Sequence, residues 1–232
     1  MEKLIYLLNR SPDMPSMGAA VLDEVVPKLR SKGAYRVTAN IADINDAVAK
    51  ANPGRFGGPW DTLGAAVSLW LDNLDARRAI EPDFAEISAG FSGYLVTESV
   101  VQGYERSWAD GDRRPGVTLF SAIGKPPAVS DEHFYHWWQD VHSQSSFRLH
   151  PCRWSYVRNA VARPLTPGAP AYRAIVLEHW RDFAEFTDDS RFFGGKAALA
   201  EMYAEIPHYC DNDTMISGPM SEYSFAWDQA AC

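Results

Sequence analysis

Cysteine is scarce in this sequence of 232 residues: it occurs three times, as Cys152, Cys210 and Cys232. The number is odd, the spacing is wide, and no CxxC pair is present. This pattern argues against the disulfide framework of a small secreted domain and against a zinc ribbon. The stretch MEKLIYLLNRS also holds too short an apolar run for a secretory signal and lacks a small-residue cleavage site. We therefore expect a cytoplasmic protein.

Long apolar runs and clustered positive charge are also missing. No window approaches the roughly 18 apolar residues that a membrane span needs. Lys and Arg number 22 against 30 Asp and Glu, which gives a formal net charge of −8. A protein that binds nucleic acid needs clustered positive charge to neutralise phosphates. The sequence therefore predicts neither a nucleic acid partner nor a membrane partner.

The motifs of several large enzyme classes are absent. The chain contains no GxSxG, no HExxH, no phosphate-binding loop and no kinase motif. The Gly-bearing stretch SRFFGGKAALAEMY lacks the spacing of a phosphate-binding fingerprint. His133 and His136 are three residues apart, but no third ligand stands in pattern with them, so we predict no metal site.

What the chain does have is an apolar content of 46%, a charged content of 22%, and an internal repeat. Each half reads as strand, helix, strand, Gly/Pro-rich loop, strand, helix and strand. The strand-like segments of the first half are KLIYLLNR, AYRVTANIAD, AAVSLWLDNL and SGYLVTESVV. Those of the second half are GVTLFSAIGK, RWSYVRNAVA, RAIVLEHWRDF and DTMISGPMSEYSF.

This order is β-α-β-β-α-β in each half, the pattern of ferredoxin-like domains. We predict an α+β protein with a first half at 1–104, a linker at 105–115 and a second half at 116–228. Helices on one face of each sheet leave the other face apolar, and two such faces can be buried against each other. The halves should therefore pack sheet to sheet as an α+β barrel. Exposed edge strands could still pair two chains, which makes a homodimer possible.

The stretch SDEHFYHWWQDVHSQ, residues 130–144, predicts an aromatic-rich helix. Ser130 is a suitable N-cap, and the two acidic residues after it favour the positive end of the helix dipole. At 100° per residue the apolar face that should pack on the sheet consists of Phe134, Trp137, Trp138 and Val141. The opposite, solvent-facing side carries His133, His136 and Asp140.

His142 is placed differently, at the edge of the apolar stripe and one turn beyond Trp138. A histidine there can act as a general acid or base, because imidazole changes its charge near neutral pH. It can equally be a half-buried histidine that only bonds to a backbone carbonyl. All six histidines lie in the second half, and the equivalent first-half helix has no histidine or aromatic ring. This asymmetry favours one working half and one supporting half.

The second half, about residues 115–228, resembles the EthD family of dimeric α+β barrels. The residues that carry the resemblance are a strand ending in GK, then FYHWWQDVHS, then WSYVRNAV and VLEHWRDF. The family's W-x-x-x-H pattern is matched by Trp138 and His142. The first half matches only in the order of its elements. The resemblance implies a ferredoxin-like fold, a pocket between the helices and the sheet, and no cofactor.

Two strand residues could share a site with His142. Alternation puts one face of a strand at Tyr172, Ala174, Val176, Glu178 and Trp180. Glu178 is costly among apolar neighbours unless it is paired, so it either serves the site or forms a salt bridge with Arg158 or Arg173. Tyr156 could donate its hydroxyl to an enol or phenolate oxygen. The predicted catalytic residues are therefore His142, Glu178 and Tyr156.

Four aromatic residues are the predicted substrate contacts: Tyr135, Trp138, Phe120 and Trp180. We expect His179 to be structural or to lie between the halves. His150 precedes a proline, where a helix should stop, and we expect it at the surface near the helix end.

These features favour a cofactor-independent enzyme of the lyase type. Its substrate would be a hydrophobic aromatic or polyketide-like molecule, decarboxylated, dehydrated or cyclised by proton transfer through His142. Two alternatives remain: a non-catalytic protein that binds small hydrophobic molecules, and a cofactor-free monooxygenase that consumes O₂.

Overall fold

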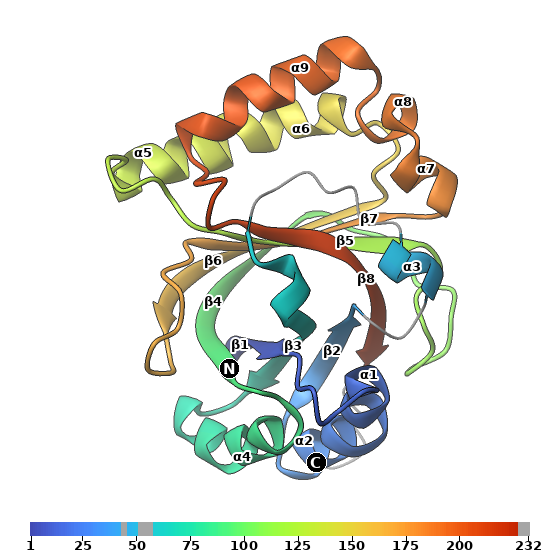
Figure 1. The fold of residues 1–232 in the computed structure, drawn as a ribbon, viewed down its shortest axis with the longest axis vertical. Helices are drawn as coiled ribbons and strands as arrows, with labels where there is room; N and C mark the ends of the chain where they lie inside the picture. Colours follow the sequence, from blue (N-terminus) through green and yellow to red (C-terminus); the bar gives the residue numbers. More distant parts are fainter. Residues whose placement is uncertain (43–45, 51–57, 227–232) are drawn as a thin grey trace.

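The computed structural model describes residues 1–42, 46–50 and 58–226, and its centre is a closed barrel of eight strands (Figure 1). The strands of the first half are β1 Glu2–Asn9, β2 Tyr35–Ile41, β3 Leu63–Leu71 and β4 Phe91–Gln102. Those of the second half are β5 Val117–Ile123, β6 Ser155–Pro164, β7 Ala174–Trp180 and β8 Ile216–Phe225. Each of the eight overlaps a predicted strand segment, with bounds that differ by a few residues. Cys232 and residues 227–228 lie outside the described residues.

The helices follow the same repeat. In the first half they are α1 Met17–Ala20, η1 Val21–Val25, α2 Val26–Ser31, α3 Asp46–Lys50, η2 Trp60–Thr62, η3 Leu74–Ala76 and α4 Arg77–Ile87. In the second half they are α5 Asp131–Tyr135, η4 His136–His142, α6 Ser143–Leu149, α7 Phe183–Thr187, α8 Asp189–Phe192, α9 Lys196–Glu205 and η5 Ile206–His208.

Two ferredoxin-like sheets join at their edges to close the barrel. The order around it is β1-β3-β2-β8-β5-β7-β6-β4, so the pairs β2–β8 and β4–β6 connect the halves. This confirms the predicted α+β barrel of two β-α-β-β-α-β halves. Each of the eight strands has a neighbour on both sides, so these strands offer no free edge for a second chain. A homodimer therefore stays a prediction, but pairing through exposed edge strands no longer supports it.

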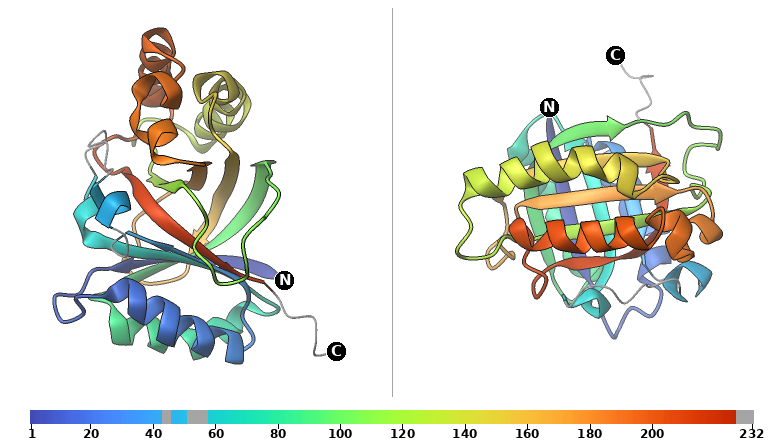
Figure 2. Two further views of the ribbon diagram at one scale, coloured as in Figure 1. Left: turned by 90° about the vertical axis from the view of Figure 1, so that its right-hand side faces the viewer. Right: turned by 90° about the horizontal axis from the view of Figure 1, so that it is seen from above.

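The two faces of the sheet have different neighbours because side chains alternate along each strand. Outside the barrel, one helical layer covers each half, on opposite sides of the molecule (Figure 2). Inside, one end of the lumen is filled by a buried apolar cluster that includes Ile5, Tyr94, Phe120, Ile175 and Met220. In β7 the predicted alternation holds from Ala174 onward. Tyr172 precedes the strand and instead joins the cluster in the lumen.

The aromatic-rich helix of the second half forms as predicted, but with a π-helical middle. Ser130 caps it by accepting a hydrogen bond from the backbone N–H of His133 at 3.1 Å. The first half carries a π-helical turn at the corresponding place, Val21–Val25. π-turns are frequent at functional sites, yet this one occurs in both halves and therefore belongs to the shared fold.

Phe120 is fully buried in the lumen, so its truncation tests the core that closes the barrel. We expect Phe120→Ala to lower the free energy of unfolding by roughly 3–5 kcal/mol, the usual cost of removing a buried aromatic ring. Phe147 is 44% exposed, and Phe147→Ala should change it by less than about 1 kcal/mol. Urea titration followed by circular dichroism measures both. Equal effects of the two substitutions would contradict this placement.

Candidate active site

His142 ends the π-helical segment and faces the sheet. Residues of the aromatic-rich helix that are buried are Phe134, Trp138, His142, Ser143, Ser146 and Leu149. Trp137 was predicted on this face, but it is only half-buried and stacks on His208 with ring centroids 3.9 Å apart. Phe134, Trp138, His142 and Ser146 follow one another at intervals of four residues, which places His142 on the buried face of the helix.

A carboxylate on another helix holds the His142 ring. Its Nδ1 lies 2.9 Å from a carboxylate oxygen of Glu205, at the end of α9. The same oxygen accepts a hydrogen bond from the Ser145 hydroxyl at 2.8 Å. The hydrogen bond with His142 is the main cause of a lowered pKa at Glu205, so this carboxyl is ionised at neutral pH. An ionised carboxylate only accepts hydrogen bonds, which assigns the proton of this pair to Nδ1 of His142.

A small, largely apolar cavity of about 40 Å³ lies beside His142, between the helices and the sheet. Trp138, Tyr156 and Glu178 also line it, so it brings together four residues that the sequence predicted for the site. The helix α9 and the segment after it supply a further wall of Met202, Ile206, Tyr209 and Cys210. β5 and β8 contribute Ser121 and Ser217, whose hydroxyls lie 2.8 Å apart.

Burial keeps the ionisable groups in this wall protonated. It raises the pKa of Tyr156 to about 12 and that of Cys210 to about 12. It also raises the pKa of Tyr209 well above its ordinary value. The two phenols can therefore donate a hydrogen bond at neutral pH but cannot act as bases. The Cys210 thiol is inert as a nucleophile, because the reactive species is the thiolate.

Glu178 is paired with Arg153, and not with the two arginines that the sequence suggested. Its carboxylate accepts a hydrogen bond from the Arg153 guanidinium at 2.5 Å. Burial acts to raise the pKa of Glu178, but the neighbouring guanidinium outweighs it and holds the pKa below its usual value. Arg153 also donates to the Ser146 hydroxyl and lies over the Tyr156 ring, 4.1 Å from its centroid.

The other predicted substrate contacts lie outside this cavity. Tyr135 is on the flank of the helix, with its ring 6.3 Å from that of Trp138. Phe120 faces the lumen, on the opposite side of the sheet. Trp180 is buried beneath α8, stacked on Phe192 at 4.4 Å. Their role in substrate binding stays a prediction.

Two further histidines are buried. The expectation that His150 lies at the surface is wrong: it is 3% exposed, surrounded by Trp180, Phe192 and Phe193, and its Nδ1 contacts the backbone oxygen of Phe192 at 2.9 Å. The aromatic pair from α8 covers the helix end, which the sequence around His150 gives no sign of. His179 faces the lumen, where its Nε2 donates to the carbonyl of Pro115 at 2.7 Å.

The sequence did not reveal Glu205, Arg153 or Tyr209 as parts of the site. Glu205 is separated from His142 by 63 residues, and a pairing between two helices leaves no local pattern. Arg153 lies in the connection between α6 and β6, just before the strand begins. In the sequence this segment has no feature that distinguishes it from an ordinary helix-to-strand connection. The run HYC at 208–210 carries an aromatic and a thiol in succession, but nothing in its spacing distinguishes it from core.

Comparison with solved structures finds this fold in other proteins. An anthrone oxidase-like protein gives a TM-score of 0.62 at 14% identity, over 100% of this chain and 96% of that one. A Fusobacterium nucleatum protein with a provisional monooxygenase assignment gives 0.53 at 10% identity, over 97% and 91%. A mutant chlorite dismutase from Candidatus Nitrospira defluvii gives 0.53 at 13% identity, over 95% and 91%. These similarities show the fold of the dimeric α+β barrels. No protein-family model and no curated protein matches.

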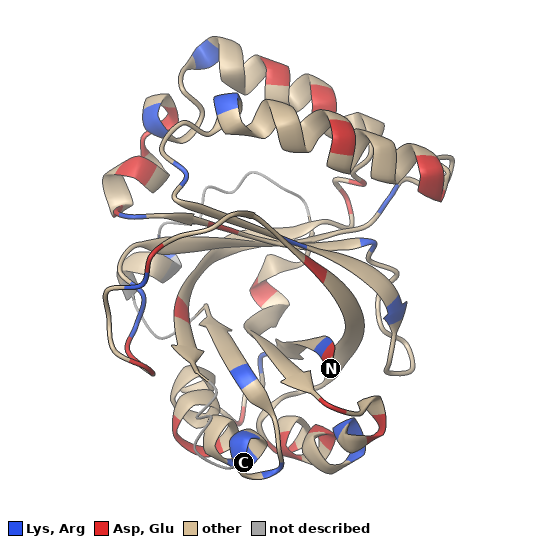
Figure 3. Ribbon diagram, turned by 180° about the vertical axis from the view of Figure 1, so that it is seen from behind, with Lys and Arg blue, Asp and Glu red and all other residues tan. Residues whose placement is uncertain are grey.

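The surface charge, the helices and the grouping of possible metal ligands bear on which partners the protein could have. Basic and acidic residues are interspersed over both helical layers (Figure 3), so neither layer presents positive charge alone. None of the helices in the described part of the chain has the length and apolar character that a membrane span requires. Within residues 1–42, 46–50 and 58–226, no three His, Cys, Asp or Glu side chains are grouped so that they could hold a metal ion.

The buried Arg153–Glu178 pair predicts an asymmetric response to mutation. Arg153→Met leaves the Glu178 carboxylate buried without a partner, and we expect it to lower the free energy of unfolding by roughly 3–5 kcal/mol. The double variant Arg153→Met/Glu178→Met removes both charges and should recover most of this loss. Chemical denaturation of the wild type, Arg153→Met, Glu178→Met and the double variant measures it. A double variant as unstable as the single one would contradict the pairing.

Buried histidines predict a stability that falls in weak acid. Burial lowers the pKa of His150 to about 4, and that of His179 well below its usual value. The unfolded chain takes up protons near pH 6.5 while the folded chain does not, so their contribution is complete above pH 6.5 and declines as the pH falls towards 4. For His150 this amounts to roughly 3 kcal/mol. Melting curves of His150→Leu should show a flatter pH profile than wild type, and exposed His133→Gln an unchanged one.

Proposed function

We propose that this protein is an acid–base enzyme whose active site is the helix–sheet cavity of the second half. The observation that carries the proposal is the contact between His142 and Glu205 at the wall of that cavity. A carboxylate bonded to Nδ1 fixes both the orientation and the tautomer of an imidazole. This is the arrangement that turns a histidine into a general base.

The proton of a substrate would be taken by Nε2 of His142. With the Nδ1 proton held by Glu205, the second nitrogen of the neutral ring carries a free lone pair. Removal of a proton from a carbon beside a carbonyl or phenol leaves negative charge on oxygen. The Tyr156 hydroxyl, protonated at neutral pH, is placed in the same wall to donate to that oxygen. Glu178 is a positioning residue, because it holds Arg153 over the Tyr156 ring.

The lining favours a hydrophobic, aromatic or polyketide-like substrate. Trp138, Val176 and Met202 offer apolar walls, and the polar groups are few. A cavity of about 40 Å³ is too small for an aromatic ring, so Met202 and Met215 must move when such a substrate enters. Methionine is suited to this, being unbranched and easily repacked. In dehydration and cyclisation His142 would remove a proton from carbon, whereas in decarboxylation the bond to CO₂ breaks and protonated His142 would return a proton to that carbon. This lyase-type chemistry is the leading proposal, in line with the EthD resemblance.

A cofactor-free monooxygenase is the second candidate, favoured by the structural similarity to an anthrone oxidase-like protein. The balanced reaction for anthrone is anthrone plus O₂ giving anthraquinone and water. His142 would remove the proton from the methylene carbon, and the resulting carbanion would reduce O₂. One oxygen atom enters the product as the new carbonyl, and the other leaves as water.

Turnover by His142 variants tests the proposal. A panel of anthrone and phenolic polyketide-like acids is assayed for product by mass spectrometry and for O₂ uptake with an electrode. For any substrate that turns over, His142→Ala should lower kcat by roughly 10²- to 10⁴-fold, the usual contribution of a positioned proton-transfer group. Glu205→Gln should act in the same direction, because an amide donor at Nδ1 favours the wrong tautomer.

The matched control is Glu201→Gln, one turn earlier on α9, where the carboxylate pairs with exposed Arg148. It should leave kcat unchanged. Oxygen uptake equal to product formed would select the monooxygenase over the lyase. Binding without turnover that also survives His142→Ala would replace both with a non-catalytic binding protein.

A further inference from the structure

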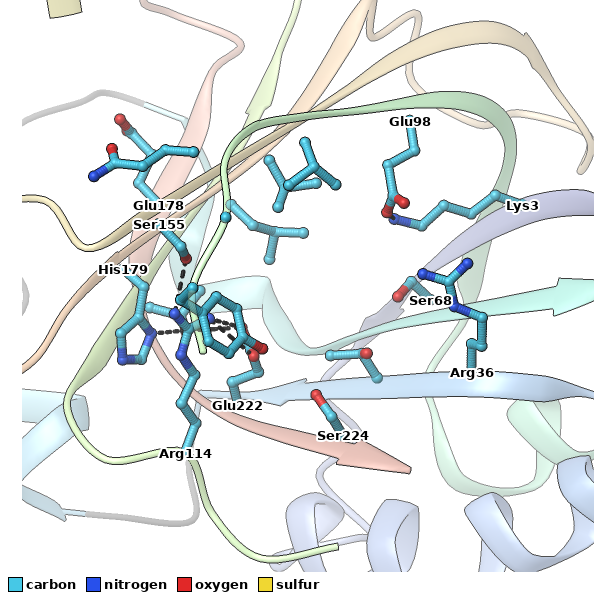
Figure 4. A pocket seen from close by; sticks show the side chains of 18 residues that line it. Lys3, Arg36, Ser68, Glu98, Arg114, Ser155, Glu178, His179, Glu222 and Ser224 are labelled. Atoms are coloured by element: carbon cyan, nitrogen blue, oxygen red, sulfur yellow. Dashed lines mark hydrogen bonds and ion pairs between the residues drawn. The ribbon is translucent and has the colours of Figure 1, made fainter. Parts of the chain in front are cut away.

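A second cavity of about 260 Å³ lies inside the barrel, at the end of the lumen opposite the apolar cluster (Figure 4). It is lined by polar side chains from the inward-facing positions of the strands. Its charged residues are Lys3 on β1, Arg36 on β2, Glu98 on β4, Arg114 before β5, Glu178 on β7 and Glu222 on β8. Of these, only Glu178 also lines the cavity beside His142, and the proposed acid–base chemistry uses none of the others.

Most charges in this cavity are already neutralised. Lys3 forms an ion pair with Glu98 and donates to the Asn159 side chain at 2.9 Å. Arg114, from the connection between the halves, pairs with Glu222 at 3.1 Å. In Figure 4 the two pairs stand on opposite sides of the cavity, with open space between them.

The Arg114 side is rigidly built. Its guanidinium donates to the Ser155 hydroxyl at 2.8 Å and lies 3.7 Å from the centroid of the Tyr104 ring. The neighbouring His179 has Nδ1 2.7 Å from the Thr118 hydroxyl, so both of its nitrogens are occupied. Arg114 Nε is buried without a hydrogen-bond partner. A fixed polar wall with one unused donor results.

Arg36 is the cation that remains unpaired. It lines the cavity at a solvent-exposed position, and its guanidinium makes no hydrogen bond or ion pair with any residue that the structure describes. Figure 4 shows its side chain rising from β2 beside Ser68, towards Lys3 and Glu98. The guanidinium lies 5.1 Å from the Trp70 ring.

The backbone is distorted to place this side chain. Arg36 has a φ of 49°, the left-handed region that non-glycine residues seldom adopt, and no other non-glycine residue in the described chain has a positive φ. The register between β2 and β3 shifts between Tyr35 and Thr38, so the ladder is irregular at this point, as in a β-bulge. Bulges redirect side chains, and strained residues persist where the surrounding structure enforces them.

We propose that this end of the lumen binds a small oxyanion, a carboxylate or a phosphate, with Arg36 as its counterion. The hydroxyls of Thr38, Ser68 and Ser224 line the same cavity and supply donors for the remaining oxygen atoms. Glu98, Glu178 and Glu222 are each paired with a cation, so the positive charge of Arg36 is left for an anion to balance. The volume of about 260 Å³ lies just below the usual range for drug-sized ligands and suits a small organic acid.

Isothermal titration calorimetry at constant ionic strength tests the site with malonate and with inorganic phosphate. Neutral malonamide is the matched control ligand. The wild-type protein should bind at least one of the anions at millimolar concentration or better, and it should not bind malonamide. A preference for malonate identifies a carboxylate ligand, and a preference for phosphate identifies a phosphorylated one.

Substitution of Arg36 locates the binding. Arg36→Gln should weaken anion binding at least tenfold, and Arg78→Gln, at an exposed arginine on α4, should not. Arg36→Gly should also lose binding while melting no lower than wild type, because glycine adopts a positive φ without strain. Absence of binding by the wild-type protein, or wild-type binding by Arg36→Gln, would overturn the proposal. His142→Ala should bind the anion as the wild-type protein does. The test of the anion site is therefore independent of the test of the proposed acid–base activity.

Discussion

Closure of the barrel is the constraint on which the rest of this structure depends. The pairs β2–β8 and β4–β6 join two four-stranded sheets into one ring, so every strand has an inner and an outer face. The outer faces pack against helices, and the inner faces meet in the lumen. Because none of these eight strands keeps a free edge, they satisfy within one molecule the pairing that a single ferredoxin-like unit would seek from a second copy. Two separate environments for chemistry follow, one under the helices and one in the lumen.

The two halves share a fold but not their side chains. Both contain a π-helical turn at the corresponding place, so this irregularity comes with the architecture. In the first half that turn carries Val21 and Val25 into an apolar core, whereas in the second it carries Trp138 and His142 to a cavity. The site therefore arises from side-chain differences on a duplicated backbone.

The sequence predicted the elements better than it predicted their contacts. Alternation and turn residues located all eight strands, because burial of one sheet face imposes a period of two. The position of His142 beside Trp138 followed from helical periodicity alone. The contact between His142 and Glu205 could not be predicted in this way, because it joins two helices that are far apart in the chain. His150 was misplaced because the aromatic residues that bury it come from α8, 42 residues later. Arg36 escaped notice because a left-handed backbone at arginine has no signature in the sequence.

Polar groups on both faces of one sheet raise the question of what keeps them from destabilising it. A buried carboxylate destabilises the fold unless it is paired. In this chain each of two buried glutamates is paired with an arginine. Arg153 precedes β6 and neutralises Glu178 on the helix side, and Arg114 precedes β5 and neutralises Glu222 on the lumen side. Each guanidinium also lies over a tyrosine ring, at 4.1 Å and 3.7 Å from the centroids. Both arginines come from connections, where the backbone is free of the strand's alternation and can supply a charge to either face. The two connections thus supply one counterion to each face of the sheet, Arg153 to Glu178 and Arg114 to Glu222.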